Sequence, residues 1–140
     1  MRSGQATMPA GSCLCGGVRY RVDGALGALV LCHCSRCRKA NGSAFQAVSP
    51  IATGDFVLLS GAELLSEYTS SPGVHRVSCR VCHAPLYSRR DAMPGTLRLR
   101  VGTLDTPVDA DIGMHIFTSD RADWYRIRDD APQYPTRPGE

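Results

Sequence analysis

Seven cysteines are the residues of this sequence whose type and spacing could do chemistry. They form three short clusters, CLC, CHCSRC and CRVC, at positions Cys13, Cys15, Cys32, Cys34, Cys37, Cys79 and Cys82. Disulfides need an oxidising compartment and favour an even number of cysteines, whereas this chain has seven and no apolar signal segment at its start. Spacings of one or two residues let two thiolates of one turn converge on a single ion, so the sequence predicts metal binding.

The spacing favours a division of the seven cysteines into four and three. An all-thiolate set suits zinc or an iron–sulfur cluster, and zinc is the usual ion of a closed four-cysteine site, so we expect zinc. The four-cysteine group contains Cys13, Cys15, Cys79 and Cys82. Because this group joins two distant turns, we expect a structural site whose metal contributes on the order of 10 kcal/mol to folding.

The remaining triplet, Cys32, Cys34 and Cys37, is one ligand short of a tetrahedron. Catalytic zinc sites commonly keep the fourth position for water or substrate, so the triplet is the candidate catalytic site. His33 is the alternative fourth ligand. A side chain between two ligands tends to point away from the ion they share, which favours an open fourth position.

Cationic residues follow the triplet closely. Ser35 is a good N-cap and Gly42 a good residue to end a helix, which predicts a short helix whose N-terminus favours thiolates. Arg36, Arg38 and Lys39 lie in this segment. They are candidates to bind the carboxylates of an acidic thiol substrate, and the alternative is that they form a solvated surface.

General acid and base candidates lie elsewhere in the chain. They are His115 and Asp105, and for both a structural role is the alternative, His115 in a strand and Asp105 in the turn GTLD. Trp124 and Tyr125 could line a ligand groove or cover the core.

The elements that must position these residues are predominantly β-strands. VRYRV at 18–22 alternates apolar and polar residues, and LRLRV at 97–101 places its leucines and Val101 on one face and Arg98 and Arg100 on the other. Further strand candidates are 44–50, 55–61, 63–69, 74–79, 84–89 and 114–118. Since no helical stripe of ten residues is present, the sequence predicts a mainly β fold of short antiparallel strands with at most one or two short helices.

The length of 140 residues fits one domain. We expect a flexible N-terminus over residues 1–10, a single metal-binding domain over 11–135 and a tail over 136–140. No apolar run approaches the ~20 residues that span a bilayer, which predicts a soluble, cytoplasmic protein with no membrane partner. Fifteen arginines stand against one lysine, a bias that suggests a bacterial genome.

The formal net charge of +3 invites a nucleic-acid hypothesis, which the cysteines weaken. Seven thiolates would remove seven charges and two divalent ions would return four, which leaves a net charge of zero. No basic run is interleaved with aromatic residues as a stacking surface requires. We therefore expect a small-molecule thiol as the partner and no nucleic acid.

Five segments of the chain resemble a known family. GSCLCGGVRY, CHCSRCRKANGSAF, CRVC, GTLD and HIFTSDRADWYRIRDDAPQYP stand in the order seen in the family of glutathione-dependent formaldehyde-activating enzyme, shared with centromere protein V. The resemblance extends from about residue 11 to residue 135. It implies a β-tent fold with two zinc ions, a structural ion on the four-cysteine group and a second ion on the triplet. The implied activity is that of a carbon–sulfur lyase, which condenses formaldehyde with glutathione to S-(hydroxymethyl)glutathione.

Three hypotheses for the function follow. The first is an enzyme that activates a thiol such as glutathione for reversible addition to formaldehyde or another small carbonyl compound. The second is a non-catalytic zinc module that binds glutathione or another thiol, and the third is a zinc-stabilised structural or interaction domain. The chain departs from the family at His83, where the family usually has a glycine, which suits a left-handed turn better than histidine does.

Overall fold

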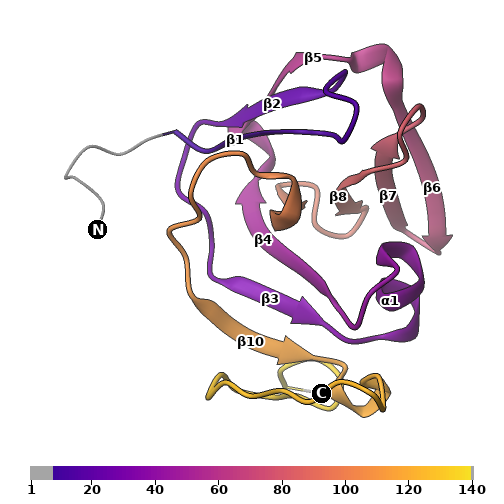
Figure 1. The fold of residues 1–140 in the computed structure, drawn as a ribbon, viewed down its shortest axis with the longest axis vertical. Coiled ribbons are helices and arrows are strands. Elements are labelled where there is room, and N and C mark those ends of the chain that lie inside the picture. Colours follow the sequence, from indigo (N-terminus) through magenta and orange to yellow (C-terminus); the bar gives the residue numbers. More distant parts are fainter. Residues whose placement is uncertain (1–7, 140) are drawn as a thin grey trace.

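The structure of the protein is a computed structural model that describes residues 8–139 (Figure 1). Residues 1–7 of the predicted flexible N-terminus and residue 140 of the predicted tail lie outside the described residues. Within residues 8–139 the chain forms ten strands and one α-helix, with four short 3₁₀ turns. The prediction of a mainly β protein with very few helices is confirmed.

The helix α1 (Ser35–Asn41) connects β3 to β4. The strands are β1 (Ala10–Ser12), β2 (Arg19–Val22), β3 (Leu29–Cys32), β4 (Gln46–Ala52), β5 (Phe56–Ser60), β6 (Leu65–Ser71), β7 (Val74–Cys79), β8 (Pro85–Arg90), β9 (Thr96–Arg100) and β10 (Ile112–Ile116). None of the helices formed by residues 8–139 has the length and hydrophobicity required to cross a membrane.

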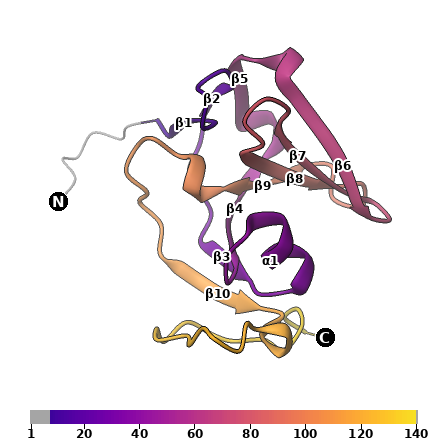
Figure 2. The same cartoon turned by 45° about the vertical axis from the view of Figure 1, so that its right-hand side comes forward.

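The strands form two sheets. A three-stranded sheet has the order β1-β2-β5, and a seven-stranded sheet has the order β10-β3-β4-β9-β8-β7-β6. All pairs are antiparallel except β10 with β3, which run parallel. The small sheet lies at one end of the molecule and β10 at the other, with α1 beside β3 and β4 (Figures 1 and 2).

Period-two patterning explains the core. In β2, Tyr20 and Val22 are buried while the arginines between and before them are exposed. In β9, Leu97 and Leu99 are buried in the main hydrophobic cluster, which extends to Tyr20 and Val22. The arginines of β9 lie on the opposite face of the sheet, as alternation predicts, yet Arg100 is only 4% exposed. This second face is therefore covered as well.

Eight strands overlap the segments that alternation predicted, and β7 has the predicted bounds 74–79. β1 and β3 were not predicted. β1 is the three-residue segment AGS, which offers no apolar alternation, and β3 runs directly into the cysteine cluster. Both strands acquire their structure from pairing with partners distant in the sequence, β1 with β2 and β3 with β4 and β10.

The helix begins one residue earlier than expected. Ser35 is its first residue, and the N-cap is Cys34, whose sulfur accepts a hydrogen bond from the Cys37 backbone N–H. A thiolate can cap a helix because the first turn has unpaired N–H groups and a partial positive charge. Gly42 ends the helix as predicted, in the left-handed conformation with φ 64°, and donates its N–H to the Arg38 carbonyl at 2.7 Å.

Candidate metal centres

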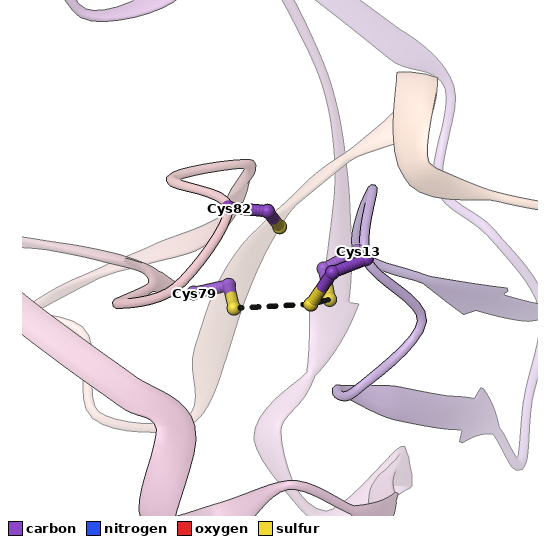
Figure 3. A group of neighbouring side chains, drawn as sticks. Cys13, Cys79 and Cys82 are labelled. Atoms are coloured by element: carbon purple, nitrogen blue, oxygen red, sulfur yellow. Dashed lines mark hydrogen bonds between the residues drawn. The ribbon is translucent and has the colours of Figure 1, made fainter.

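Four cysteines from two distant turns converge in the first cluster, here called the four-cysteine site. Cys13 and Cys15 follow β1, Cys79 ends β7, and Cys82 lies in the turn before β8. Figure 3 shows Cys79 and Cys82 facing Cys13 across the gap between the two turns. The four sulfurs all lie within 4.8 Å of one another and could hold a metal ion.

Sulfur–sulfur distances test whether zinc fits the four-cysteine site. Four sulfurs at the ordinary zinc–sulfur distance of about 2.3 Å lie about 3.8 Å apart at the corners of a tetrahedron. The sulfurs of Cys13 and Cys15 are 3.5 Å apart, and those of Cys15 and Cys79 are 3.9 Å apart. The residues present therefore fit a tetrahedral zinc ion without rearrangement of the two turns.

Both turns are shaped by backbone groups around the sulfurs. Gly16, with φ 80°, donates its N–H to the Cys13 carbonyl at 3.1 Å, and the Val18 N–H donates to the Cys13 sulfur at 3.2 Å. In the second turn the His83 N–H donates to the Cys79 carbonyl at 2.8 Å. His83 has φ 64°, so histidine occupies the left-handed conformation that a glycine adopts without strain.

We expect His83→Gly to raise the free energy of unfolding by about 1 kcal/mol. A left-handed backbone costs a residue with a Cβ atom roughly 1–2 kcal/mol, and the greater entropy of unfolded glycine offsets part of the gain. Thermal unfolding of the metal-loaded protein measures the change. His83→Ala is the control, since alanine keeps the strain, and an equal rise in both variants would assign the effect to the side chain rather than to the backbone.

The second cluster is the triplet Cys32, Cys34 and Cys37, at the junction of β3 and α1. Its three sulfurs lie within 4.8 Å of one another and could hold a metal ion. The sulfurs of Cys37 and Cys32 are 3.1 Å apart, and the Cys37 N–H donates to the Cys34 sulfur at 3.3 Å. A zinc ion would spread the closest pair by a few tenths of an ångström, toward the tetrahedral spacing of about 3.8 Å.

The three thiols of the triplet do not ionise equally. Hydrogen bonds from the Cys32 thiol, and then from the Cys37 thiol, lower the pKa of Cys34 far below its usual value. Hydrogen bonds to Cys34, and then to Cys37, together with burial raise the pKa of Cys32. The triplet therefore holds one thiolate readily and resists more negative charge until a cation joins it, which is the behaviour expected of a metal-ligand set.

His33 stands between two members of the triplet but its ring lies elsewhere. It is fully buried, and its Nε2 is 2.8 Å from Nδ1 of His115. His33 is not part of the cluster that could hold a metal ion. Burial, and then the positive charges of His115 and Arg121, lower the pKa of His33 to about 4, so the ring is neutral at pH 7. Within the described residues, the three sulfurs therefore have no histidine as a fourth ligand.

A pocket of about 150 Å³, here called the arginine pocket, opens over the triplet. The three cysteines line it together with a single carboxylate, that of Asp120, among the described residues. The arginines that line it are Arg36, Arg76, Arg90, Arg98 and Arg137. Three adjacent strands, α1 and the C-terminal segment thus bring cations to one small space beside the sulfurs.

Strand register explains why these arginines meet. Arg98 of β9 pairs with Ser88 of β8, two residues before Arg90, and Ser88 pairs with Arg76 of β7. Cys32 of β3 pairs with Gln46 of β4, on the same face, because Val48 pairs with Arg100. One face of the seven-stranded sheet therefore carries both the arginines and the first cysteine of the triplet.

The arginine pocket holds more positive charge than its neighbours balance. Arg76 donates to Gln46 Oε1 at 3.0 Å, and its Nη2 lies 3.8 Å from the Cys37 sulfur. Nε of Arg90 is buried without a hydrogen-bond partner among the described residues. Burial, and then the positive charge of Arg137, lower the pKa of the Arg90 guanidinium. Such buried cations favour an anionic ligand.

The structure separates the three cations that the sequence proposed for substrate binding. Arg36 lines the arginine pocket, whereas Arg38 and Lys39 are not among its lining residues. Sequence reasoning missed Arg76, Arg90, Arg98 and Arg137. The alternation of LRLR does place Arg98 on the polar face of its strand. No local pattern, however, indicates that this face lies against the cysteines.

The proposed acid and base residues lie outside the arginine pocket. Asp105 accepts a hydrogen bond from the Ser12 hydroxyl at 2.7 Å and lines a separate cavity of about 630 Å³, which no triplet cysteine lines. His115 is fully buried between His33 and Asp129. Trp124 is 69% exposed. Tyr125 packs near Phe45 and His33, with ring centroids 5.4 and 6.3 Å away.

Comparison with known proteins agrees with this arrangement. Residues 8–120 match the family model described as glutathione-dependent formaldehyde-activating enzyme. A protein of Halomonas elongata, provisionally named as a glutathione-dependent formaldehyde-activating enzyme, is 29% identical over 125 residues, which cover 84% of this chain and 79% of the relative. The crystal structure of a Rhodobacter sphaeroides protein is similar in fold, with a TM-score of 0.62 and 21% identity over 89% of this chain and 98% of that one. The chain belongs to the glutathione-dependent formaldehyde-activating enzyme family.

Proposed function

We propose that the protein is a zinc-dependent enzyme that activates an acidic thiol, such as glutathione, for reversible addition to formaldehyde or another small carbonyl compound. The reaction is that of a carbon–sulfur lyase. The observation that carries the proposal is the location of three clustered cysteine sulfurs, with no fourth protein ligand among the described residues, in a pocket lined by five arginines.

Cys32, Cys34 and Cys37 would hold the zinc ion, which when bound supplies a Lewis acid that lowers the pKa of a thiol in its fourth position. The three cysteine thiolates already place three negative charges at this point. They therefore favour presentation of a substrate thiolate over strong polarisation of a carbonyl oxygen. The substrate sulfur would form a bond to the carbonyl carbon as the carbonyl π bond breaks, and the proton lost by the thiol would balance the proton gained by the carbonyl oxygen.

The arginines would bind the carboxylates of the thiol substrate. Three thiolates and a divalent ion together carry one negative charge, and five arginines with Asp120 carry four positive charges, so the arginine pocket keeps a net charge of about +3. Arginine binds carboxylates through parallel N–H donors, which fixes the orientation of the ligand as well as its position. Arg90 and Arg98 stand on adjacent strands, and each would donate hydrogen bonds to both oxygens of one substrate carboxylate.

The four-cysteine site would serve the fold. A metal ion there closes the chain between residue 13 and residue 82 and joins the turn after β1 to the turn before β8. Cys13 and Cys79 are buried in the main hydrophobic cluster, so this ion would be an integral part of the core. Its four sulfurs leave no position for a substrate.

One observation favours the second hypothesis, a module that binds a thiol without turnover. The general acid and base candidates His115 and Asp105 do not line the arginine pocket, where the only titratable oxygen among the described lining residues belongs to Asp120. The two hypotheses differ only in whether the protein changes the rate at which the hemithioacetal forms and breaks down. Formation and breakdown of the hemithioacetal of glutathione and formaldehyde, followed with and without the protein, distinguish them.

We expect Cys37→Ser to retain the fold, to bind one zinc ion where the unaltered protein binds two, and to lose glutathione binding. The reason is that Cys37 belongs to the triplet and not to the four-cysteine site. Metal analysis gives the stoichiometry, isothermal titration with glutathione gives the affinity, and circular dichroism reports the fold.

Ala40→Ser is the matched control, because it adds a hydroxyl to the exposed side of the same helix without touching a sulfur. It should bind two zinc ions and glutathione. A single ion in the unaltered protein, or undiminished glutathione binding by Cys37→Ser, would contradict the proposal.

A further inference from the structure

A hydrogen-bonded chain of three side chains leads away from the triplet. His33 Nε2 lies 2.8 Å from His115 Nδ1, and His115 Nε2 lies 3.0 Å from both carboxylate oxygens of Asp129. Both histidines are fully buried, whereas the Asp129 side chain is 36% exposed. These three hydrogen-bonded side chains thus start in the interior at His33, which stands between Cys32 and Cys34 in the sequence, and end at the surface of the protein.

The carboxylate fixes the direction of the hydrogen bond that it makes. Asp129 can only accept, so His115 donates from Nε2, and the other ring nitrogen of His115, Nδ1, shares a hydrogen bond with His33 Nε2. The hydrogen bond with His115 also lowers the pKa of Asp129, which keeps it ionised. Nδ1 of His33 is buried without a hydrogen-bond partner among the described residues. Among the described residues, the His33 ring therefore makes its hydrogen bond to His115, and its other ring contacts are with Phe45 and Tyr125.

The backbone gives the chain a rigid support. The His33 N–H donates to the Ile116 carbonyl at 3.0 Å, and Ile116 pairs with Cys32 in the parallel register of β10 and β3. The His115 N–H donates to the Pro132 carbonyl at 2.8 Å, and the His115 carbonyl accepts from the Tyr134 N–H at 2.9 Å. The C-terminal segment runs along β10 (Figure 1) and binds both backbone groups of His115, while β3 pairs with β10 on the other side.

We propose that Asp129 and His115 are positioning residues for the triplet, acting through the ring of His33. Successive side chains of an extended segment point to opposite sides, so a ring anchored on one side directs the sulfurs of Cys32 and Cys34 to the other. Any backbone rotation at His33 would break its hydrogen bond and displace both sulfurs. The inference rests on the proposed function, in which the triplet holds a metal ion.

The sharpest test is the rate at which metal leaves each site. The protein is loaded with zinc and challenged with an excess of chelator, and the unaltered protein should release one ion quickly, from the triplet, and one slowly, from the four-cysteine site. We expect Asp129→Asn to accelerate the fast phase about tenfold, as loss of groups that support metal ligands does elsewhere, and to leave the slow phase unchanged. Asp129→Glu should restore the original rate. Cobalt-loaded Asp129→Asn should show a shifted absorption band for the triplet only.

Asp23→Asn is the matched control. Asp23 also accepts from a basic side chain, Arg21 Nε at 2.7 Å, but Arg21 belongs to β2 in the three-stranded sheet and neither residue lines the arginine pocket. It should change neither phase. An unchanged fast phase in Asp129→Asn would overturn the inference and leave the proposed function standing. Equal acceleration of both phases would also overturn it, because Asp129 and His115 would then stabilise the whole fold and not the triplet in particular. Release of a single ion by the unaltered protein would overturn both.

Discussion

Replacing Cys79 with serine should unfold the protein. Cys79 is fully buried at the end of β7, in contact with the main hydrophobic cluster, and it is one of the four sulfurs that would share the structural ion. A bound zinc ion contributes on the order of 10 kcal/mol to the folding of small domains. A domain of this size is stable by only about 5–15 kcal/mol, so loss of the ion removes most or all of that stability.

Circular dichroism and thermal unfolding of Cys79→Ser measure the effect, with Cys37→Ser as the control from the other cluster. We expect no cooperative transition in the first variant and a clear one in the second. Addition of a strong chelator to the unaltered protein should reproduce the result for Cys79→Ser once both ions have been removed. A folded Cys79→Ser with a normal transition would show that the four-cysteine site does not support the fold through a metal.

Replacing Arg98 with glutamine should weaken glutathione binding by about ten- to hundredfold. Removal of one partner from a desolvated ion pair commonly costs about 2 kcal/mol of binding free energy, which corresponds to a loss of affinity in this range. Arg98 stands on the inner face of β9 beside the triplet. Burial lowers the pKa of its guanidinium, and the nearby Cys32 and Cys37 act in the opposite direction. Isothermal titration measures the affinity. Metal content should remain at two ions per chain, since Arg98 is not a ligand.

Lys39→Gln is the control for Arg98→Gln. This substitution also removes one positive charge near the triplet, but Lys39 lies outside the arginine pocket. Its affinity for glutathione should change by less than about twofold, as expected for an exposed charge that is screened by salt. A neutral thiol, 2-mercaptoethanol, provides a second control, since it has no carboxylate to lose. If Arg98→Gln weakened both thiols equally, the arginine would not be binding a carboxylate.

The metal ligands could be grouped from the sequence because their chemistry is encoded locally. Cysteines one or two residues apart lie on one turn, and the number seven leaves a set of four and a set of three. Most strands were also predictable, since alternation in β2, β7 and β9 reflects burial on one side of each strand. In each case the signal lies within a few consecutive residues.

The surroundings of the triplet could not be predicted because they depend on pairings between distant segments. Arg76, Arg90 and Arg98 come together only through the register of β7, β8 and β9. The parallel pairing of β10 with β3 brings His115 beside Leu31, and thereby next to His33, across 82 positions of the sequence. A single arginine or histidine in a strand carries no local sign of the partner that it will meet.

The parallel pairing of β10 with β3 also sets the order in which the protein can mature on the ribosome. All four ligands of the four-cysteine site are available once Cys82 has emerged, whereas the triplet lacks its support until translation has passed Tyr134. At 5–20 residues per second, the interval between the two events is about 3–10 s. During that time the nascent chain would carry a completed four-cysteine site and a triplet whose three thiols lack the support of His115. We expect the triplet to be most exposed at this stage to oxidation or to binding of a metal other than zinc.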